Sequence, residues 1–169
     1  MVNSLRLGSV PISALEVESK KGLLYGVLDT CDAPAIRSKL QEIPNTSACL
    51  YRDQADETLL AVAPFLAIVD EKLLSWLASS VWTEPWGIFV VAPIDIKSLL
   101  KHLRKFLLVQ SPENEIVYFR YYDPRCLATF LLNCSSDDLN DFFGPVSAYA
   151  FVDSQGLVQV AELSKTRGF

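Results

Sequence analysis

The stretch YFRYYDPRCL, residues 118–127, predicts a strand that turns directly into a helix. Aromatic residues precede the turn, and such residues are typical of strands. Asp123 can accept hydrogen bonds from the first helical turn, and Pro124 suits the first helical position, where its missing N–H is not needed. Arg120 and Arg125 are close enough in sequence to pair with Asp123. We therefore expect a capped corner between strand and helix, with an ion pair beside it.

Strand-like and helix-like segments alternate on both sides of this corner. Short apolar runs predict strands at residues 23–29, 48–52, 87–92 and 115–122. Helices are expected at residues 35–41, 70–79, 95–107, 124–133 and 137–142. Strands separated by helices favour an α/β fold with a mixed, partly parallel sheet flanked by helices. Residues 146–152 and 157–162 alternate in polarity and predict a C-terminal antiparallel hairpin.

Length and composition favour one domain of a cytoplasmic protein. We expect an N-terminal segment at residues 1–20, a single α/β domain at 21–163 and a tail at 164–169. The residue types AVILMFWYC make up 50% of the 169 residues, which is enough for a well-developed core. The net charge of -5 argues against nucleic-acid binding, which needs a basic face to displace counterions from phosphates. We expect no signal peptide, because no apolar stretch of signal-peptide length follows Arg6. We expect no membrane insertion, because no apolar run approaches the roughly 20 residues that span a bilayer.

Groups that could carry catalysis or bind a metal are sparse. The single histidine, His102, falls away from the apolar side of helix 95–107, so we expect it on the solvent-exposed surface. The cysteines form no C-x-x-C pair, which predicts reduced, buried thiols and no zinc site. They are Cys31, Cys49, Cys126 and Cys134. The glycines are isolated and form no phosphate-binding loop. We therefore expect no catalytic residue, no metal and no cofactor.

Two further groups of side chains are candidates for partner binding. Helix 95–107 carries a basic stripe opposite its leucine face, which is either a solvated surface or a means of steering an acidic partner. Its members are Lys97, Lys101, Arg104 and Lys105. Three tryptophans cluster around residues 79–85, namely Trp76, Trp82 and Trp86. We expect two of them to close the core, and an exposed one would be an anchor for a protein partner.

The run from Phe119 to Arg125 resembles the signature of the type VI secretion effector adaptors, also called effector chaperones. Other segments agree with that family in order, at residues 24–29, 47–51, 63–66, 86–89, 102–105 and 142–145. The resemblance extends from about residue 23 to residue 152. Such adaptors bind a toxic effector protein, often through its N-terminal region, and help to mount it on the VgrG spike. They are not known as enzymes.

The resemblance implies a non-catalytic, protein-binding adaptor. Many members carry a further C-terminal helical lobe, which we expect to be absent or reduced here, and this leaves open whether the chain contacts both effector and spike. We expect the residues that bind a partner or support the motif to be Arg120, Tyr122, Asp123, Pro124, Arg125, Trp86, Lys101 and Arg104. Two alternatives stay open. One is an enzyme that acts on an anionic substrate through Arg120, Asp123 and Arg125, and the other is an immunity-like protein that neutralises a toxin directly.

Overall fold

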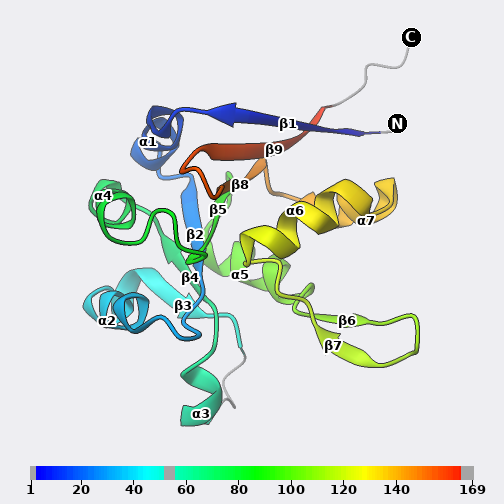
Figure 1. Ribbon diagram of the computed structural model, residues 1–169, viewed down its shortest axis with the longest axis horizontal. Coiled ribbons are helices and arrows are strands. Elements are labelled where there is room, and N and C mark those ends of the chain that lie inside the picture. Colours follow the sequence, from blue (N-terminus) through cyan, green and yellow to red (C-terminus); the bar gives the residue numbers. More distant parts are fainter. Residues whose placement is uncertain (1–2, 52–55, 165–169) are drawn as a thin grey trace.

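A seven-stranded antiparallel sheet lies at the centre of the protein in a computed structural model, which describes residues 3–51 and 56–164 (Figure 1). The strand order is β1-β9-β8-β5-β2-β4-β3. The strands are β1 (Ser4–Val10), β2 (Leu24–Leu28), β3 (Ser47–Cys49), β4 (Phe65–Ile68), β5 (Gly87–Val91), β8 (Ala148–Val152) and β9 (Val158–Ser164). A separate two-stranded hairpin joins β6 (Leu108–Gln110) to β7 (Ile116–Tyr118).

Helices cover both faces of the sheet and bury it in two apolar clusters. One face carries α1 (Ile12–Lys20), α2 (Pro34–Glu42) and α4 (Glu71–Ser80). The other face carries α5 (Ile96–Arg104), α6 (Pro124–Asn133) and α7 (Ser136–Phe143). Two short helical segments, Pro44–Thr46 and α3 (Glu57–Leu60), lie in the connections around β3. The central strand β2 is buried along its whole length, because both of its faces are covered.

The prediction of a partly parallel sheet is wrong, since every pair of neighbouring strands in the described residues is antiparallel. The connections explain the error. The helical connection from β2 leads to β3, which runs in the same direction but lies beyond β4. The connection from β4 leads in the same way to β5, which lies beyond β2. Each crossover thus skips a strand of opposite direction, which the local sequence pattern does not reveal.

The predicted C-terminal hairpin is confirmed. Strands β8 and β9 pair antiparallel, with Val152 opposite Val158 at the turn. Residues 4–20 contribute β1, which pairs with β9 along its full length, and α1, which packs against α4. The limits of the single domain at residues 21–163 stay a prediction.

Aspartate caps begin several helices at the expected places. The side chains of Asp70, Asp95 and Asp123 accept hydrogen bonds from backbone N–H groups at the starts of α4, α5 and α6. Helix α5 ends at Arg104 rather than at residue 107, because the chain turns there into β6. The strand predicted at residues 115–122 is shorter and belongs to the separate hairpin.

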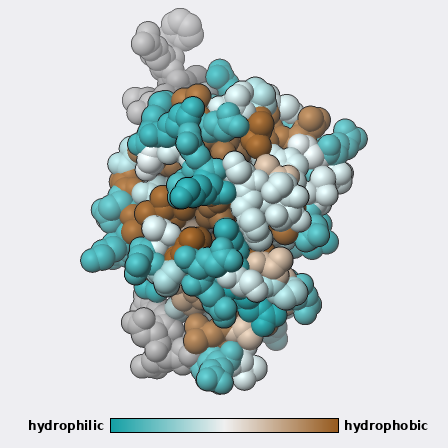
Figure 2. Space-filling model, turned by 90° about the vertical axis from the view of Figure 1, so that its left-hand side faces the viewer, coloured by the Kyte–Doolittle hydropathy of each residue, from teal (hydrophilic) through white to brown (hydrophobic). Residues whose placement is uncertain are grey.

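None of the helices that the structure describes is long and apolar enough to cross a membrane. On the face that carries α1, α2 and α4, hydrophilic side chains surround smaller hydrophobic areas (Figure 2).

Gly87 provides a test of the central strand pairing. Its φ angle is +149°, and a Cβ atom at this position would run into the carbonyl group of Val27 on β2. We predict that Gly87→Ala lowers the free energy of unfolding by about 3 kcal/mol, measured by urea denaturation. The control is Gly8→Ala on β1, where no heavy atom lies within 4 Å and the change should stay within about 0.5 kcal/mol. Equal stability of the two variants would contradict this packing.

Candidate functional site

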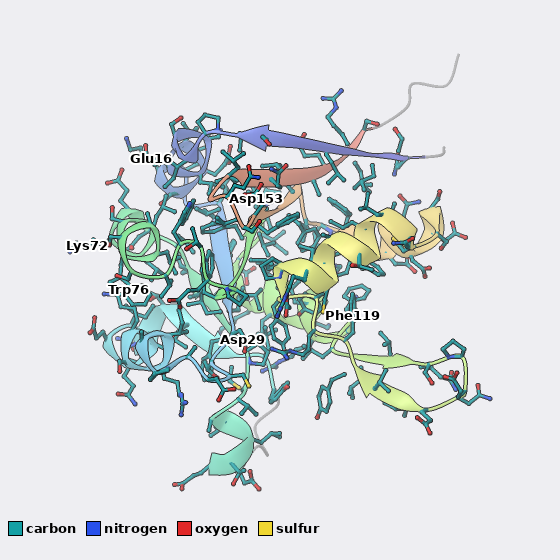
Figure 3. The ribbon with its side chains drawn as sticks, in the orientation of Figure 1. Glu16, Asp29, Lys72, Trp76, Phe119 and Asp153 are labelled. Carbon is teal, nitrogen blue, oxygen red and sulfur yellow. The ribbon has the colours of Figure 1, made fainter. Side chains whose placement is uncertain are left out.

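An ion pair between Asp29 and Arg120 joins the central sheet to the start of the predicted corner. Asp29 directly follows β2 and is buried, and its Oδ2 accepts a hydrogen bond of 2.6 Å from Nη2 of Arg120. Its Oδ1 accepts a second hydrogen bond from the backbone N–H of Cys31 at 2.9 Å. The Asp29 backbone N–H donates to the carbonyl oxygen of Trp86 at 2.8 Å. Figure 3 shows Asp29 at the lower end of the sheet and Phe119 between α6 and the hairpin.

The Arg120 guanidinium lies over the Tyr122 ring, 5.8 Å from its centre. Tyr51 is a neighbour of Tyr122 and acts on its hydroxyl. Burial and the neighbouring Tyr51 raise the pKa of Tyr122 well above its usual range, so its hydroxyl stays protonated. Burial opposes the charge on Arg120, but the hydrogen bond and the negative charge of Asp29 outweigh this and raise the Arg120 pKa.

Asp123 forms a second ion pair, with Arg125. Its Oδ1 accepts from Nε of Arg125 at 3.0 Å, and its Oδ2 accepts from Nη2 at 2.7 Å. The hydrogen bonds from Arg125 lower the pKa of Asp123, although burial opposes this. Pro124 occupies the first position of α6, as predicted. The expectation that both arginines pair with Asp123 is wrong for Arg120, because the chain turns through the buried Tyr121 and Tyr122 and carries Arg120 toward Asp29.

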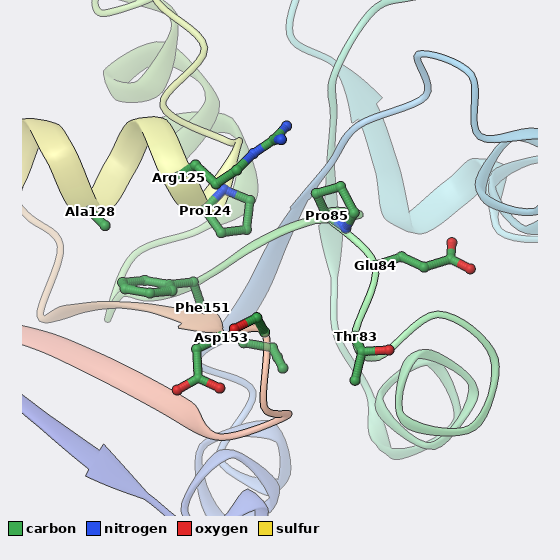
Figure 4. A pocket seen from close by; sticks show the side chains of 10 residues that line it. Thr83, Glu84, Pro85, Pro124, Arg125, Ala128, Phe151 and Asp153 are labelled. Carbon is green, nitrogen blue, oxygen red and sulfur yellow. The ribbon is translucent and has the colours of Figure 1, made fainter.

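Two surface hollows meet at Arg125. One, of about 540 Å³, lies between the hairpin and α6 and is lined by aromatic side chains and by Arg120 and Arg125. The aromatic side chains are Tyr118, Phe119 and Phe130. We call it the hairpin hollow. The other, of about 350 Å³, lies between the start of α6 and the loop around Pro85 (Figure 4). We call it the loop hollow, and its lining includes Arg125, Phe151, Glu84 and Asp153.

The remaining predicted site residues lie elsewhere and differ in their surroundings. Trp86 is buried, and its ring lies edge-on to that of Phe89, with 4.9 Å between the ring centroids. Its backbone carbonyl oxygen accepts the hydrogen bond from the Asp29 backbone N–H. Arg104 donates hydrogen bonds to the carbonyl oxygens of Cys49 and Leu50, and so ties α5 to the end of β3. Lys101 is exposed on α5 and lines neither hollow. The structure therefore brings together Arg120, Tyr122, Asp123, Pro124 and Arg125, whereas Trp86 belongs to the apolar cluster on the other face of the sheet.

The prediction that His102 lies on the surface is wrong. Its side chain is buried, and Nε2 donates a hydrogen bond of 2.8 Å to the carbonyl oxygen of Phe142 at the end of α7. Gly144, with φ of +47°, ends α7 and lies directly against the imidazole. A residue with a side chain at position 144 would collide with the ring, so the glycine makes room for the histidine.

The thiols differ from the prediction in exposure. Cys126 is exposed and lines the hairpin hollow, and Cys31, Cys49 and Cys134 are partly exposed, so the expectation of buried thiols is wrong for all four. Within residues 3–51 and 56–164, no cluster of three or more His, Cys, Asp or Glu side chains is arranged to hold a metal ion.

Sequence reasoning missed three parts of the site, namely Asp29, Tyr51 and strand β6. Asp29 had a signal, because an acidic residue that directly follows an apolar run is placed at the buried end of a strand. Strand β6 also had one, since apolar runs flank the turn sequence Ser-Pro-Glu-Asn at residues 111–114. For Tyr51, nothing in its neighbourhood in the sequence pointed to Tyr122.

Comparison with known protein families assigns the chain to a family. A family model described as "Domain of unknown function (DUF4123)" matches residues 24–141, which is more than half of the sequence. The chain belongs to the DUF4123 family. The match begins at β2 and ends within α7, so the DUF4123 region includes Asp29, Arg120, Asp123 and Arg125. Searches of curated proteins and of solved structures found no match.

The buried His102 of this DUF4123 protein predicts a pH dependence of stability. Burial lowers the pKa of His102 below the ordinary value of 6.5, although its hydrogen bond to Phe142 opposes this. The unfolded chain then binds the proton more readily, so the free energy of unfolding falls as the pH falls from about 7 to about 5.5. Urea denaturation at several pH values measures this slope, and His102→Gln should remove it.

Asp123 also has a shifted pKa, but it acts in a different pH range from His102. Its lowered pKa contributes stability that is present above about pH 4 and lost only at more acidic pH. An unchanged slope between pH 7 and 5.5 in the His102→Gln variant would contradict the assignment to His102.

Proposed function

We propose that this chain is a non-catalytic adaptor that binds a type VI secretion effector, through the effector's N-terminal region, and helps to load it onto the VgrG spike. The observation that carries the proposal is the projecting hairpin of β6 and β7, whose apolar side chains are exposed (Figure 1). The order of sequence motifs that resembles the effector adaptors supports the identity of the partner.

The hairpin is apolar on both of its faces. Leu108 pairs with Tyr118 and Val109 pairs with Val117, and successive pairs point to opposite faces. Ile116 is 75% exposed, Tyr118 56% and Leu108 53%. Contiguous apolar surface of this kind marks sites of protein interaction in soluble proteins. A two-stranded hairpin is also only marginally stable by itself, so a partner that covers it would stabilise it.

The base of the hairpin is firmly attached to the protein. The backbone N–H of Phe119 donates to the carbonyl oxygen of Leu107 at 2.8 Å, and the Tyr118 ring lies 5.6 Å from that of Tyr51. The next residue, Arg120, forms the ion pair with Asp29. This attachment fixes the hairpin before binding, and a preorganised surface loses less conformational entropy when it binds.

The ion pairs also bear on the enzyme alternative. Both carboxylate oxygens of Asp123 accept hydrogen bonds from Arg125, and both of Asp29 accept hydrogen bonds as well. Carboxylates engaged in this way act as structural anchors that orient the arginines. The arrangement thus supports a binding surface better than an acid–base site.

The test is co-purification with the toxin encoded by a neighbouring gene. We predict that the tagged chain retains this effector, and that Ile116→Glu lowers the recovered amount about tenfold, because an apolar side chain buried at the interface contributes about 1.5–3 kcal/mol. Deleting the adaptor gene should abolish delivery of that effector into target cells.

Val17→Glu is the matched control, since Val17 is 50% exposed on α1 at the opposite side of the sheet. It should retain the effector fully, and both variants should keep the wild-type melting temperature. Failure of the wild-type chain to retain the effector, together with intact delivery after deletion, would refute the proposal. Turnover of a small anionic molecule that Asp123→Asn abolishes without loss of folding would favour the enzyme alternative instead.

A further inference from the structure

We infer that the hairpin hollow recognises an acidic and apolar segment of the partner, which places an apolar side chain among the aromatic rings and a neighbouring carboxylate on Arg125 and Arg120. This inference rests on the proposed function and specifies the chemistry of the bound segment. Neither the family match nor the apolar hairpin by itself defines that chemistry.

Among the residues that the structure describes, the lining of the hairpin hollow is aromatic and its charged side chains are positive. Tyr118, Phe119 and Phe130 supply the apolar surface, and the Phe119 and Phe130 rings pack 4.9 Å apart. The charged residues of the lining are Arg120 and Arg125. The hollow is an open surface depression of about 540 Å³, which is large enough to take apolar side chains of a partner.

The ion pairs leave donors on both arginines for a partner. The Asp29 and Asp123 side chains are 8% and 7% exposed, whereas those of Arg120 and Arg125 are 46% and 77% exposed. A guanidinium has five N–H donors, and Arg125 uses two of them on Asp123. The buried carboxylates therefore orient the guanidinium groups and leave further N–H groups at the surface. Planar pairs of N–H donors fit a carboxylate well.

The loop hollow differs from the hairpin hollow because its lining includes acidic side chains. The inference therefore applies to one side of Arg125. Glu84 and Asp153 line the loop hollow, and they would repel an incoming carboxylate. The Asp153 side chain is also occupied, because it accepts hydrogen bonds from Gln155, Leu157 and Gln159. An acidic segment is thus directed to the hairpin side of Arg125, where none of the described lining residues is a carboxylate.

The experiment selects phage-displayed random peptides on the full chain and measures the binding of a labelled enriched peptide by fluorescence anisotropy. We expect the enriched peptides to contain an acidic residue beside an apolar one. Replacing that acidic residue by its amide should weaken binding about tenfold. Arg125→Glu should weaken it at least as much, and Arg37→Glu on α2 should leave it unchanged.

A second pair of variants leaves the Asp123–Arg125 ion pair intact. Thr129→Trp places a bulky ring in the hairpin hollow and should weaken peptide binding about tenfold. Asn133→Trp, one turn further along α6 and outside both hollows, should leave it unchanged. Basic or purely apolar enriched peptides, no enrichment at all, or equal binding by Thr129→Trp and Asn133→Trp would overturn the inference.

The effector itself separates this inference from the proposed function. If the wild-type chain retains the effector, and Arg125→Glu and Thr129→Trp retain it equally well, the adaptor function stands and the inference about the hollow fails. If the wild-type chain does not retain the effector, the proposed function fails, and the peptide-binding experiment decides the inference about the hollow by itself.

Discussion

The hydrogen-bonded ion pair of Asp29 and Arg120 connects two parts of the chain that are 91 residues apart. Asp29 ends the central strand β2, and Arg120 stands between the projecting hairpin and α6. Among the described strands, β6 and β7 pair with each other and with no other strand, so the orientation of this hairpin depends on the contacts at its base. Together with the contact between Tyr118 and Tyr51, the ion pair therefore fixes where the exposed apolar side chains and the hairpin hollow lie relative to the sheet.

The two ion pairs share one electrostatic design. In each, a buried carboxylate accepts hydrogen bonds from an arginine and from a backbone N–H, so its negative charge is compensated inside the protein. The arginines keep an exposed side, which gives the surface a positive character in a chain whose net charge is -5. Aromatic side chains surround these cations, and the combination is typical of surfaces that bind other proteins.

Local features were predictable from the sequence, and features that depend on distant partners were not. The caps at Asp70, Asp95 and Asp123 act on the next few residues, so the sequence alone located the starts of α4, α5 and α6. The capped start of α6 at Asp123 and Pro124 and the C-terminal hairpin were predictable for the same reason, whereas the strand before the corner ends earlier than predicted, at Tyr118. The direction of neighbouring strands was not, because strands far apart in sequence alternate in the sheet. His102 was misplaced because its partner, Phe142, is 40 residues away. The partner of Arg120 was misassigned in favour of the nearer Asp123.

A double-mutant cycle on Asp29 and Arg120 tests the central claim most directly. Asp29→Asn, Arg120→Gln and the double variant would be compared with the wild type by urea denaturation, with hydrogen exchange at the amides of β6 and β7 followed in parallel. The account predicts a coupling energy of about 1 kcal/mol, limited by the exposure of Arg120, and faster exchange in the hairpin of each single variant. A coupling energy near zero with unchanged hairpin exchange would contradict it.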